Sequence, residues 1–458
     1  MIDPVGSNRA PARSANRPAA GQAAELLIAL LLVVGFFVGP LKLLGDSWVS
    51  YLGADSLAVL ILLMVAADRL IKRAPLIAAS PLSIPLVSLI VLCVLELANP
   101  EAPFIRSILG LRSWLLYPLL YFVGLYFFRS VSQLRKLYAL LVVLGILTSA
   151  YGIYQWKMGP QAFATWSDQY GRYARVMWSS TGSVSVFRAF STFVLPNTFG
   201  ENMALVMILA FSVAASPGVA RWWRLLAGAA FGVMAVGIAA SGTRAPVVHL
   251  LSAIGIGVLL IGSSGRRLKL ICTAALLTAA GIALVAFIIG PLVSARFLTV
   301  LDSESFFWKW FLPLGEGLRI AREHPFGMGL GYTAGVPHML TTPVFQDLPV
   351  TTLDSGYGSA AAELGFVGFA VFGYLAVKVG IEGIRTWRSL RPGVLRDLLL
   401  GPALLAVTYP VVSVIAQPQA TLPSTIYLWL LVGMLMKAPA LQKELNADKL
   451  PPHEMHAR

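Results

Sequence analysis

Long apolar runs alternate with polar connections along almost the whole chain. A helix that crosses a bilayer needs about 17–25 predominantly apolar residues. Runs of this kind lie near 24–43, 54–71, 82–98, 113–128, 137–156, 196–215, 225–242, 245–263, 270–291, 357–379, 398–416 and 423–437. The pattern predicts an all-α fold, a polytopic membrane helix bundle of about 12 transmembrane helices.

The composition supports the same class of protein. Of the 458 residues, 57% are hydrophobic and 12% are charged, and the mean hydropathy is +0.76. These values are typical of integral membrane proteins. The net charge of +14 fits orientation signals and contact with membrane lipid, and we expect no nucleic-acid partner. Cys93 and Cys272 lie inside apolar runs, so we predict two core residues without a disulfide or metal-type spacing.

Basic residues are shared unequally between the two sides of the predicted bundle. Of the 35 Lys and Arg residues, 23 fall in the two tails and the even-numbered connections, and 12 fall on the other side. Lys and Arg concentrate in cytoplasmic loops, so both termini are predicted to be cytoplasmic. The chain then divides into a disordered cytoplasmic tail (1–22), a transmembrane domain (23–437) and a second cytoplasmic tail (438–458).

Two connections on the predicted outer side are long, at about 157–195 and 292–356. Long structured loops on a membrane bundle usually carry function. The second loop contains FFWKWFLPLGEGLRIAREH (306–324), which is aromatic at its start and charged at its end. This segment is either an amphipathic helix at the membrane interface or a failed span, and its charges and Pro313 favour the interfacial helix.

The stretch LDSGYGSAAAELGFVGF (353–369) changes from polar to apolar, as a segment does when it enters a bilayer. Asp354 stands at the crossing point, followed by small residues that allow close helix packing. An ionisable side chain at the mouth of a span is a functional candidate. Alternatively, Asp354 is only the N-cap of the following helix, and the local sequence leaves both interpretations open.

Two arginines on the predicted outer side are embedded among small and turn-forming residues. Arg188 precedes the sixth span, and Arg244 lies in the short turn SGTRAP. A guanidinium offers a rigid fork of donors that fits phosphate and keeps its charge. Contact with lipid headgroups is the alternative for each arginine taken singly. Together they suit a lipid-linked pyrophosphate.

The candidate residues lie in four segments whose order and side are characteristic. These are RAFSTFVLPNTFGEN (188–202), SGTRAP (241–246), EHPFGMGLGY (323–332) and DSGYGSAAAELGFVG (354–368). With the hydropathy layout, they resemble the O-antigen ligase / Wzy polymerase superfamily of bacterial envelope glycan enzymes. The resemblance extends over most of the chain from the fourth span onward.

This resemblance implies an inner-membrane glycosyltransferase of the fold called GT-C. Such enzymes transfer a glycan from undecaprenyl pyrophosphate to a hydroxyl acceptor on the periplasmic face, with inversion and without a metal or other cofactor. Arg188 and Arg244 match the arginines that bind the donor pyrophosphate. We expect Asp354, Arg244 and Arg188 to be catalytic. The predicted substrate-binding residues are Arg188, Arg244, Ser355, Arg319, Arg322 and His338.

The chain departs from the family at one position. The ligases share a pattern of His, then Asn, Ser or Gln, nine residues, Gly, two residues, and Gly, Thr or Tyr. Ser355, Gly365 and Gly368 fit this pattern with the spacing intact, but Asp354 occupies the histidine position. The difference favours a polymerase of exopolysaccharide or O-antigen repeat units over a ligase acting on lipid A–core. His338 is an alternative source of the missing imidazole.

Other ionisable residues fit structural roles. Glu363 lies about 13 Å beyond Asp354 in a continuous helix, too deep for the same site unless the helix breaks, and we expect it to pair with a basic or polar group. His249 is predicted to be a hydrogen-bonded core residue and His324 a turn residue. The pair Asp302 and Glu304 is interpreted as a solvated turn.

The chemistry of glycosyl transfer requires charge stabilisation on the leaving pyrophosphate and help in deprotonating or orienting the acceptor. Two guanidiniums supply the first, and a carboxylate within hydrogen-bond reach supplies the second as a general base. A transporter of polysaccharide or lipid is the non-enzyme alternative, although most spans lack the polar midplane groups it needs. A protein acceptor, as in an O-oligosaccharyltransferase, also remains open.

Overall fold

The computed structural model describes residues 19–44, 48–163, 177–181, 184–260, 264–289, 303–333, 353–418 and 421–447. Most of the predicted N-terminal tail and the last part of the C-terminal tail fall outside these ranges. The first helix begins at Ala19 and the last ends at Ala447. Both therefore extend past the boundaries at 22 and 438 that the sequence predicts.

Helices make up nearly all of the described chain. They are α1 (Ala19–Phe36), α2 (Val38–Leu44), α3 (Trp48–Ile71), α4 (Ser83–Leu95), α5 (Phe104–Leu111), α6 (Leu120–Phe127), α7 (Val131–Met158), α9 (Pro196–Ala214), α10 (Arg221–Ser241), α11 (Ala245–Leu260), α12 (Ser264–Ile288), α14 (Ser303–Glu323), α15 (Gly356–Ser389), α16 (Val394–Leu398), α17 (Leu400–Ile415) and α18 (Ser424–Ala447). Two short 3₁₀ helices, η1 (Glu96–Ala98) and η3 (Gly159–Phe163), and a π-helical stretch, η2 (Arg112–Leu116), complete the helical part.

The predicted spans all coincide with helices. In the part of the chain that the structure describes, 8 helices are long and apolar enough to cross a membrane, and α1, α4 and α11 are shorter apolar helices. The predicted helical architecture is confirmed, and several helices could cross a membrane, whereas the count of about 12 crossings stays a prediction. One element was not predicted: β1 (Trp178–Thr181) and β2 (Val184–Phe187) form an antiparallel hairpin in the first long outer connection.

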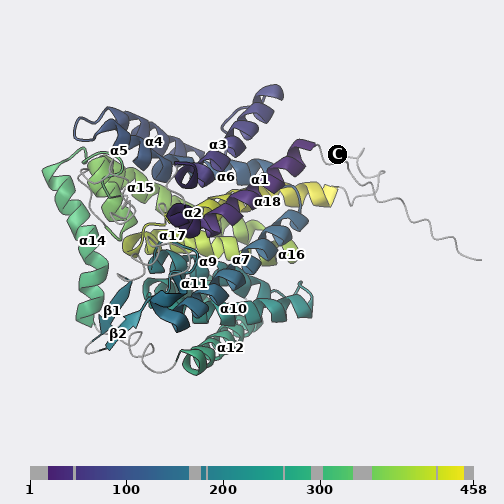
Figure 1. The fold of residues 1–458 in the computed structure, drawn as a ribbon. Coiled ribbons are helices and arrows are strands. Elements are labelled where there is room, and N and C mark those ends of the chain that lie inside the picture. The colour runs from purple at the N-terminus through teal and green to yellow at the C-terminus, as the bar shows by residue number, and fades with distance from the viewer. Residues whose placement is uncertain are drawn as a thin grey trace, which may run out of the picture.

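The two ends of the bundle differ in what they carry (Figure 1). The beginning of α1 and the end of α18 lie at one end, and α14 and the hairpin lie at the other. Helix α14 lies across the bundle end, at a large angle to the long helices (Figure 1). This is the orientation expected of a helix at a membrane interface, and the interfacial location itself stays a prediction.

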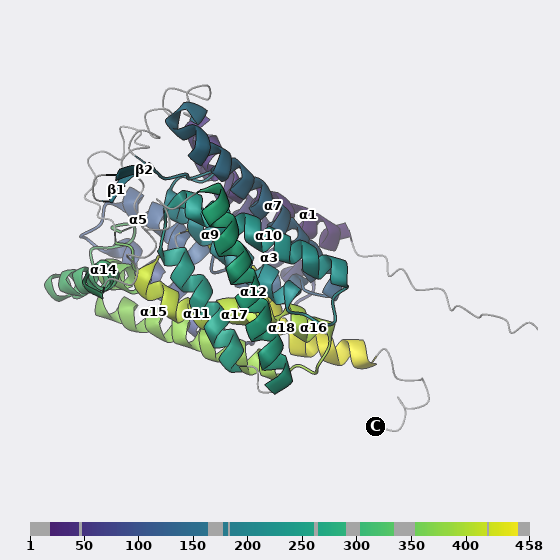
Figure 2. The same ribbon diagram turned by 90° about the horizontal axis from the view of Figure 1, so that it is seen from below.

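Burial separates central helices from peripheral ones. Helices α9, α17 and α18 are buried along most of their length, and α17 packs against α9, α11 and α15 (Figure 2). Helix α12 lies at the periphery, where Leu276, Ile282 and Phe287 are exposed, as suits contact with lipid. Cys93 is buried as predicted, but Cys272 is exposed on α12, so the prediction of a core residue there was wrong.

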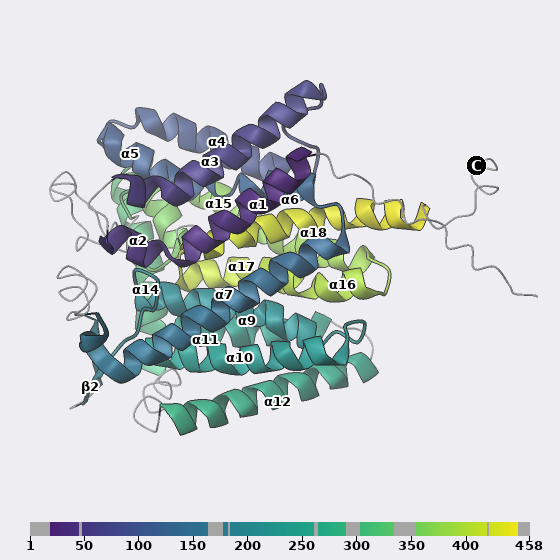
Figure 3. The same cartoon turned by 45° about the vertical axis from the view of Figure 1, so that its right-hand side comes forward.

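Glycines set the closest helix contacts in the central layer. A Cβ added at Gly124 of α6 would lie 2.1 Å from the carbonyl oxygen of Leu430, and one at Gly433 of α18 would lie 2.1 Å from that of Tyr121. The backbones of α6 and α18 therefore touch without intervening side chains, which is how membrane helices gain packing energy. Figure 3 shows these two helices side by side.

Candidate active site

The segment between the hairpin and α9 carries the first arginine into the bundle. The Arg188 N–H donates to the Met177 carbonyl at 2.9 Å, and the Ala189 N–H donates to the Ala240 carbonyl at 3.0 Å. Further along, the buried Gln155 side chain exchanges two hydrogen bonds with the backbone of Ser191, at 2.7 and 2.9 Å. Protein groups therefore satisfy the backbone of this irregular segment.

The Arg188 guanidinium joins two of the four sequence segments. Its Nε–H donates to the Ser241 carbonyl and its Nη2–H donates to the Thr243 hydroxyl, both at 3.1 Å. Arg244 is the next residue along, half-buried like Arg188, immediately before α11. The two predicted pyrophosphate-binding arginines therefore lie at one place.

A glycine in α9 makes this meeting possible. A Cβ on Gly200 would lie 2.9 Å from the Pro246 ring and 3.0 Å from the Ser241 hydroxyl. Any side chain there would push α9 away from the turn that carries Arg244. The close approach of NTFGEN and SGTRAP therefore depends on a glycine at position 200.

The N-cap of α15 is Ser355, not Asp354. The Ser355 hydroxyl accepts a hydrogen bond from the Gly358 N–H at 3.1 Å and donates to the Ser413 carbonyl at 3.4 Å. The alternative in which Asp354 is only a helix cap is therefore wrong. Ser355 is completely buried, so its predicted part in substrate binding has no support from its position.

Main-chain contacts with α17 hold the chain at residue 354. The Gly356 N–H donates to the Ala416 carbonyl at 2.8 Å. The Gln417 amide donates to the Leu353 carbonyl and, at 2.5 Å, to the Ser359 hydroxyl. None of these hydrogen bonds involves the Asp354 side chain.

The Asp354 carboxyl group is in contact with solvent and is partly surrounded by protein. The residue is exposed, yet enough protein surrounds the carboxyl that burial raises its pKa above the ordinary value of 3.8, and the positive charge of Arg188 acts in the opposite direction. A raised pKa makes the carboxylate a stronger base. The positive charge of Arg188 acts on the Asp354 carboxyl, so the two candidate side chains are near enough to influence each other electrostatically.

Helix α15 breaks at Gly365, whose φ of 65° and ψ of −162° are not helical. The break turns the last carbonyls of the first half-helix toward the EHPFGMGLGY segment. The Met328 N–H donates to the Ala362 carbonyl at 2.8 Å, and the Gly329 N–H donates to the Glu363 carbonyl at 3.0 Å. In return the Phe366 N–H donates to the Pro325 carbonyl at 3.1 Å. Main-chain hydrogen bonds thus hold the glycine-rich segment against α15 at its break.

Glu363 is the centre of this junction. Its carboxylate accepts hydrogen bonds from the Trp114 indole, the Gly331 N–H and the Thr333 N–H, each at 2.8 Å, and from the Thr333 hydroxyl at 2.5 Å. Arg106, also buried, donates to the Met328 carbonyl beside it at 2.5 Å. The prediction that Glu363 pairs with polar groups in the bundle is confirmed, and it fixes the glycine-rich segment.

Helix α14 docks on the first half of α15 through glycine. A Cβ at Gly317 would lie 2.2 Å from the Gly358 carbonyl oxygen.

On the exposed side of α14, Arg319 forms ion pairs with Glu316 at 2.6 Å and with Glu323 at 2.5 Å. Arg322 is exposed as well.

The remaining predicted residues have varied outcomes. Arg319 and Arg322 lie on α14 at the same bundle end as Asp354, and their binding role stays a prediction.

His338 lies outside the described residues, as does Asp302. His324 is in the turn after α14, 3.7 Å from Glu101. Within the described ranges, no group of three or more His, Cys, Asp or Glu side chains could hold a metal ion.

Sequence reasoning missed two supporting residues, Gln155 and Gln417. Each is a single amide at the outer end of an apolar span, Gln155 in α7 and Gln417 just after α17. A side-chain amide in such a place must find partners, because an unsatisfied polar group is costly away from water. That signal was present in the sequence, although it does not reveal which backbone groups the amides bind.

The comparison with known families agrees with the resemblance inferred from the motifs. Residues 229–373 match the family Wzy_C, described as O-antigen ligase. This segment is similar to the Wzy_C family. It holds Arg244, the glycine-rich segment 323–332 and Asp354, whereas Arg188 lies before it. The match covers about a third of the chain, and no curated protein matches the chain.

Proposed function

We propose that this protein is an inner-membrane glycosyltransferase that transfers a glycan from undecaprenyl pyrophosphate to a hydroxyl acceptor on the periplasmic face. The match to the Wzy_C family supports an O-antigen ligase or polymerase type of activity. The observation that carries the proposal is the pair of hydrogen bonds from the Arg188 guanidinium to the 241–243 turn, directly before Arg244. The charge of Arg188 also acts on the Asp354 carboxyl. Both termini are then cytoplasmic.

The roles follow from charge. The guanidiniums of Arg188 and Arg244 bind the pyrophosphate and stabilise the negative charge that grows as the bond from the sugar to the phosphate oxygen breaks. Asp354, its pKa raised by burial, accepts or orients the hydroxyl proton of the acceptor. Attack from the face opposite the leaving group inverts the anomeric centre, and none of these steps calls for a metal or other cofactor.

The acceptor favoured here is a second lipid-linked repeat unit, which makes the protein a polymerase of exopolysaccharide or O-antigen. The support is Asp354, a carboxylate at the position where the ligase pattern has histidine. The second candidate is a ligase that attaches glycan to lipid A–core, favoured by the description of the matching family. Glycan analysis of a deletion strain separates them: a polymerase loses polymer, and a ligase loses long-chain lipopolysaccharide.

The arginines provide the direct test. Purified protein in nanodiscs is given an undecaprenyl-pyrophosphate repeat unit as donor and acceptor, and chain growth is measured. Arg188→Lys and Arg244→Lys keep the positive charge but lose the planar fork. Each should reduce turnover roughly 10- to 100-fold, as expected for loss of one charge-assisted hydrogen bond, and alanine should reduce it further.

The matched control is Arg221→Lys. Arg221 is exposed at the start of α10, the helix whose other end is Ser241, so this variant should keep wild-type turnover. Wild-type turnover by both of the site variants would leave Arg188 and Arg244 as lipid headgroup contacts and would refute their proposed role.

A further inference from the structure

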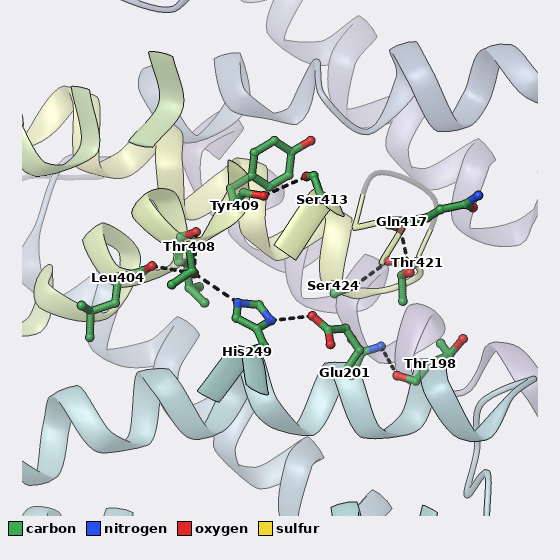
Figure 4. A network of polar contacts seen from close by, with 12 residues as sticks. Thr198, Glu201, His249, Leu404, Thr408, Tyr409, Ser413, Gln417, Thr421 and Ser424 are labelled. Carbon is green, nitrogen blue, oxygen red and sulfur yellow. Dashed lines mark hydrogen bonds and ion pairs between the residues drawn. The ribbon is translucent and has the colours of Figure 1, made fainter. Parts of the chain in front are cut away.

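A buried polar connection joins the three helices α9, α11 and α17 (Figure 4). His249 of α11 lies with Nδ1 2.6 Å from Glu201 Oε1 of α9, and with Nε2 3.1 Å from the Thr408 hydroxyl of α17. His249 is 4% exposed, Glu201 5% and Thr408 not at all. The prediction that His249 is a hydrogen-bonded core residue is confirmed, but its partners were not foreseen.

Every polar group in this connection has a hydrogen-bond partner. The Thr408 hydroxyl donates to the Leu404 carbonyl at 2.8 Å and can accept a hydrogen bond from His249 Nε2–H. Nδ1 and the Glu201 carboxyl are hydrogen-bonded to each other. Polar groups that are paired in this way cost less among apolar side chains than unpaired ones.

The three helices are those that begin or end at the candidate active site. Glu201 lies in the second turn of α9, near the end of the segment 188–202 that starts with Arg188. His249 lies five residues beyond Arg244 in α11, about 7.5 Å along the helix axis. Thr408 belongs to α17, whose outer end holds the backbone beside Asp354 through Ala416.

Packing alone does not call for ionisable residues at these positions. Replacing a buried ion pair with apolar residues of similar size is often neutral or stabilising, and ionisable side chains inside membrane spans mark function by default. Apolar contact also leaves helices free to slide or rotate by small amounts, because it is not directional. A hydrogen-bonded chain through three helices fixes their register.

We propose that Glu201, His249 and Thr408 are positioning residues that hold Arg188, Arg244 and Asp354 in register for glycosyl transfer. This inference rests on the proposed function. The connection acts through the helices and touches neither donor nor acceptor. A displacement of about 1 Å at reacting groups can cost about 10²-fold in rate, so the rigid connection matters to turnover more than to folding.

Three variants test the inference in the nanodisc assay. Glu201→Leu removes the bond to Nδ1 and should lower kcat on the order of 10- to 100-fold, with the KM of the acceptor unchanged. Glu201→Gln can still bond to Nδ1 and should restore most of the turnover. The double variant Glu201→Leu/His249→Leu leaves no unpaired polar group, so it should unfold at the wild-type temperature and still show the low kcat.

A threonine pair gives the matched control. Thr408→Val removes the hydroxyl that accepts from His249 and should lower kcat. Thr148 of α7 is also buried and also donates to a carbonyl of its own helix, Leu144, at 2.8 Å, but it accepts nothing from His249. Thr148→Val should therefore keep wild-type kcat.

The possible outcomes separate this inference from the proposed function. Wild-type kcat in the folded double variant, together with impaired Arg188→Lys, would overturn the positioning role and leave the transferase standing. Equal losses in Thr408→Val and Thr148→Val would overturn it too, because the effect would then be general to buried hydroxyls. A wild-type protein inactive on lipid-pyrophosphate glycans would overturn both.

Discussion

At the scale of single residues, the neighbours Ser355 and Asp354 have different roles: the first stabilises the helix, and the second is the candidate for chemistry. Ser355 caps α15 and is completely buried, whereas Asp354 is exposed and takes no part in the bonds that hold this backbone. The carboxylate is therefore available to a substrate. Leu353, on the other side of Asp354, is buried as well. Of the three residues 353–355, Asp354 therefore has the exposed side chain.

The Asp354→Asn variant tests the proposed acceptor role. Asparagine has the same shape and cannot accept a proton, and general base help is worth roughly 10² to 10⁴ in rate. We expect turnover of the purified variant to fall by that order with an unchanged unfolding temperature. Ser355→Ala, in contrast, removes the N-cap of α15 and should lower the free energy of unfolding by about 0.5–2 kcal/mol.

The pH profile adds a control to this test. Burial raises the pKa of Asp354 above its ordinary value, and the active form is the carboxylate. Wild-type activity should therefore fall as the pH drops through that raised pKa. Asp354→Asn should lack this acid limb. Near wild-type turnover by the Asn variant would assign the acceptor role to another group.

At the scale of elements, the break in α15 organises the site. A helix that continued through Gly365 would have used the carbonyls of Ala362 and Glu363 internally. The break instead gives both to the glycine-rich segment, in which Gly327, Gly329 and Gly331 all have positive φ. This pairing fixes the end of α14 against the first half of α15, which carries Ser355 and adjoins Asp354.

Gly365→Ala tests the importance of the break. Alanine disfavours φ of 65°, and its Cβ would lie 2.1 Å from the Pro325 carbonyl oxygen, so we expect a loss of stability of more than about 1 kcal/mol and a loss of turnover. Gly373→Ala on the same helix is the control, because its Cβ would meet nothing closer than 3.7 Å. Thermal unfolding in detergent measures both, and equal effects would contradict the role of the break.

At the scale of the whole molecule, the site groups gather at one end of the bundle. Helix α14 and the hairpin lie at that end, and the two ends of the described chain lie at the other. The bias of 23 basic residues against 12 predicts that the end with the termini is cytoplasmic. The connections 157–195 and 292–356 are then periplasmic.

Cysteine labelling tests this topology. In a Cys93→Ala/Cys272→Ala background, Gln161→Cys and Glu323→Cys should react with a membrane-impermeant thiol reagent in intact spheroplasts, because both positions are exposed on the predicted outer side. Pro392→Cys, exposed between α15 and α16, should react only after the membrane is opened. Protection of either outer cysteine would contradict the orientation.

How far the sequence predicts this molecule depends on the range of each interaction. The helices follow from apolar runs, a local signal, and all the predicted spans lie on helices. Arg188 and Arg244 were selected by their motif contexts, but their meeting depends on Gly200 and Thr243, which no periodicity reveals. The hairpin was missed because its short strands carry no strong pattern, and the exposure of Cys272 depends on where α12 packs.

Three helices begin at the proposed site: α9 after the Arg188 segment, α11 after Arg244 and α15 after Asp354. The first turn of a helix carries the equivalent of about +0.5 elementary charge, because the peptide dipoles of the helix are aligned. The backbone thus contributes positive potential of its own, in addition to the guanidiniums, where an anionic pyrophosphate would be bound. No side-chain substitution removes this part, so a protein lacking both arginines would still attract anions there, and more weakly as ionic strength rises.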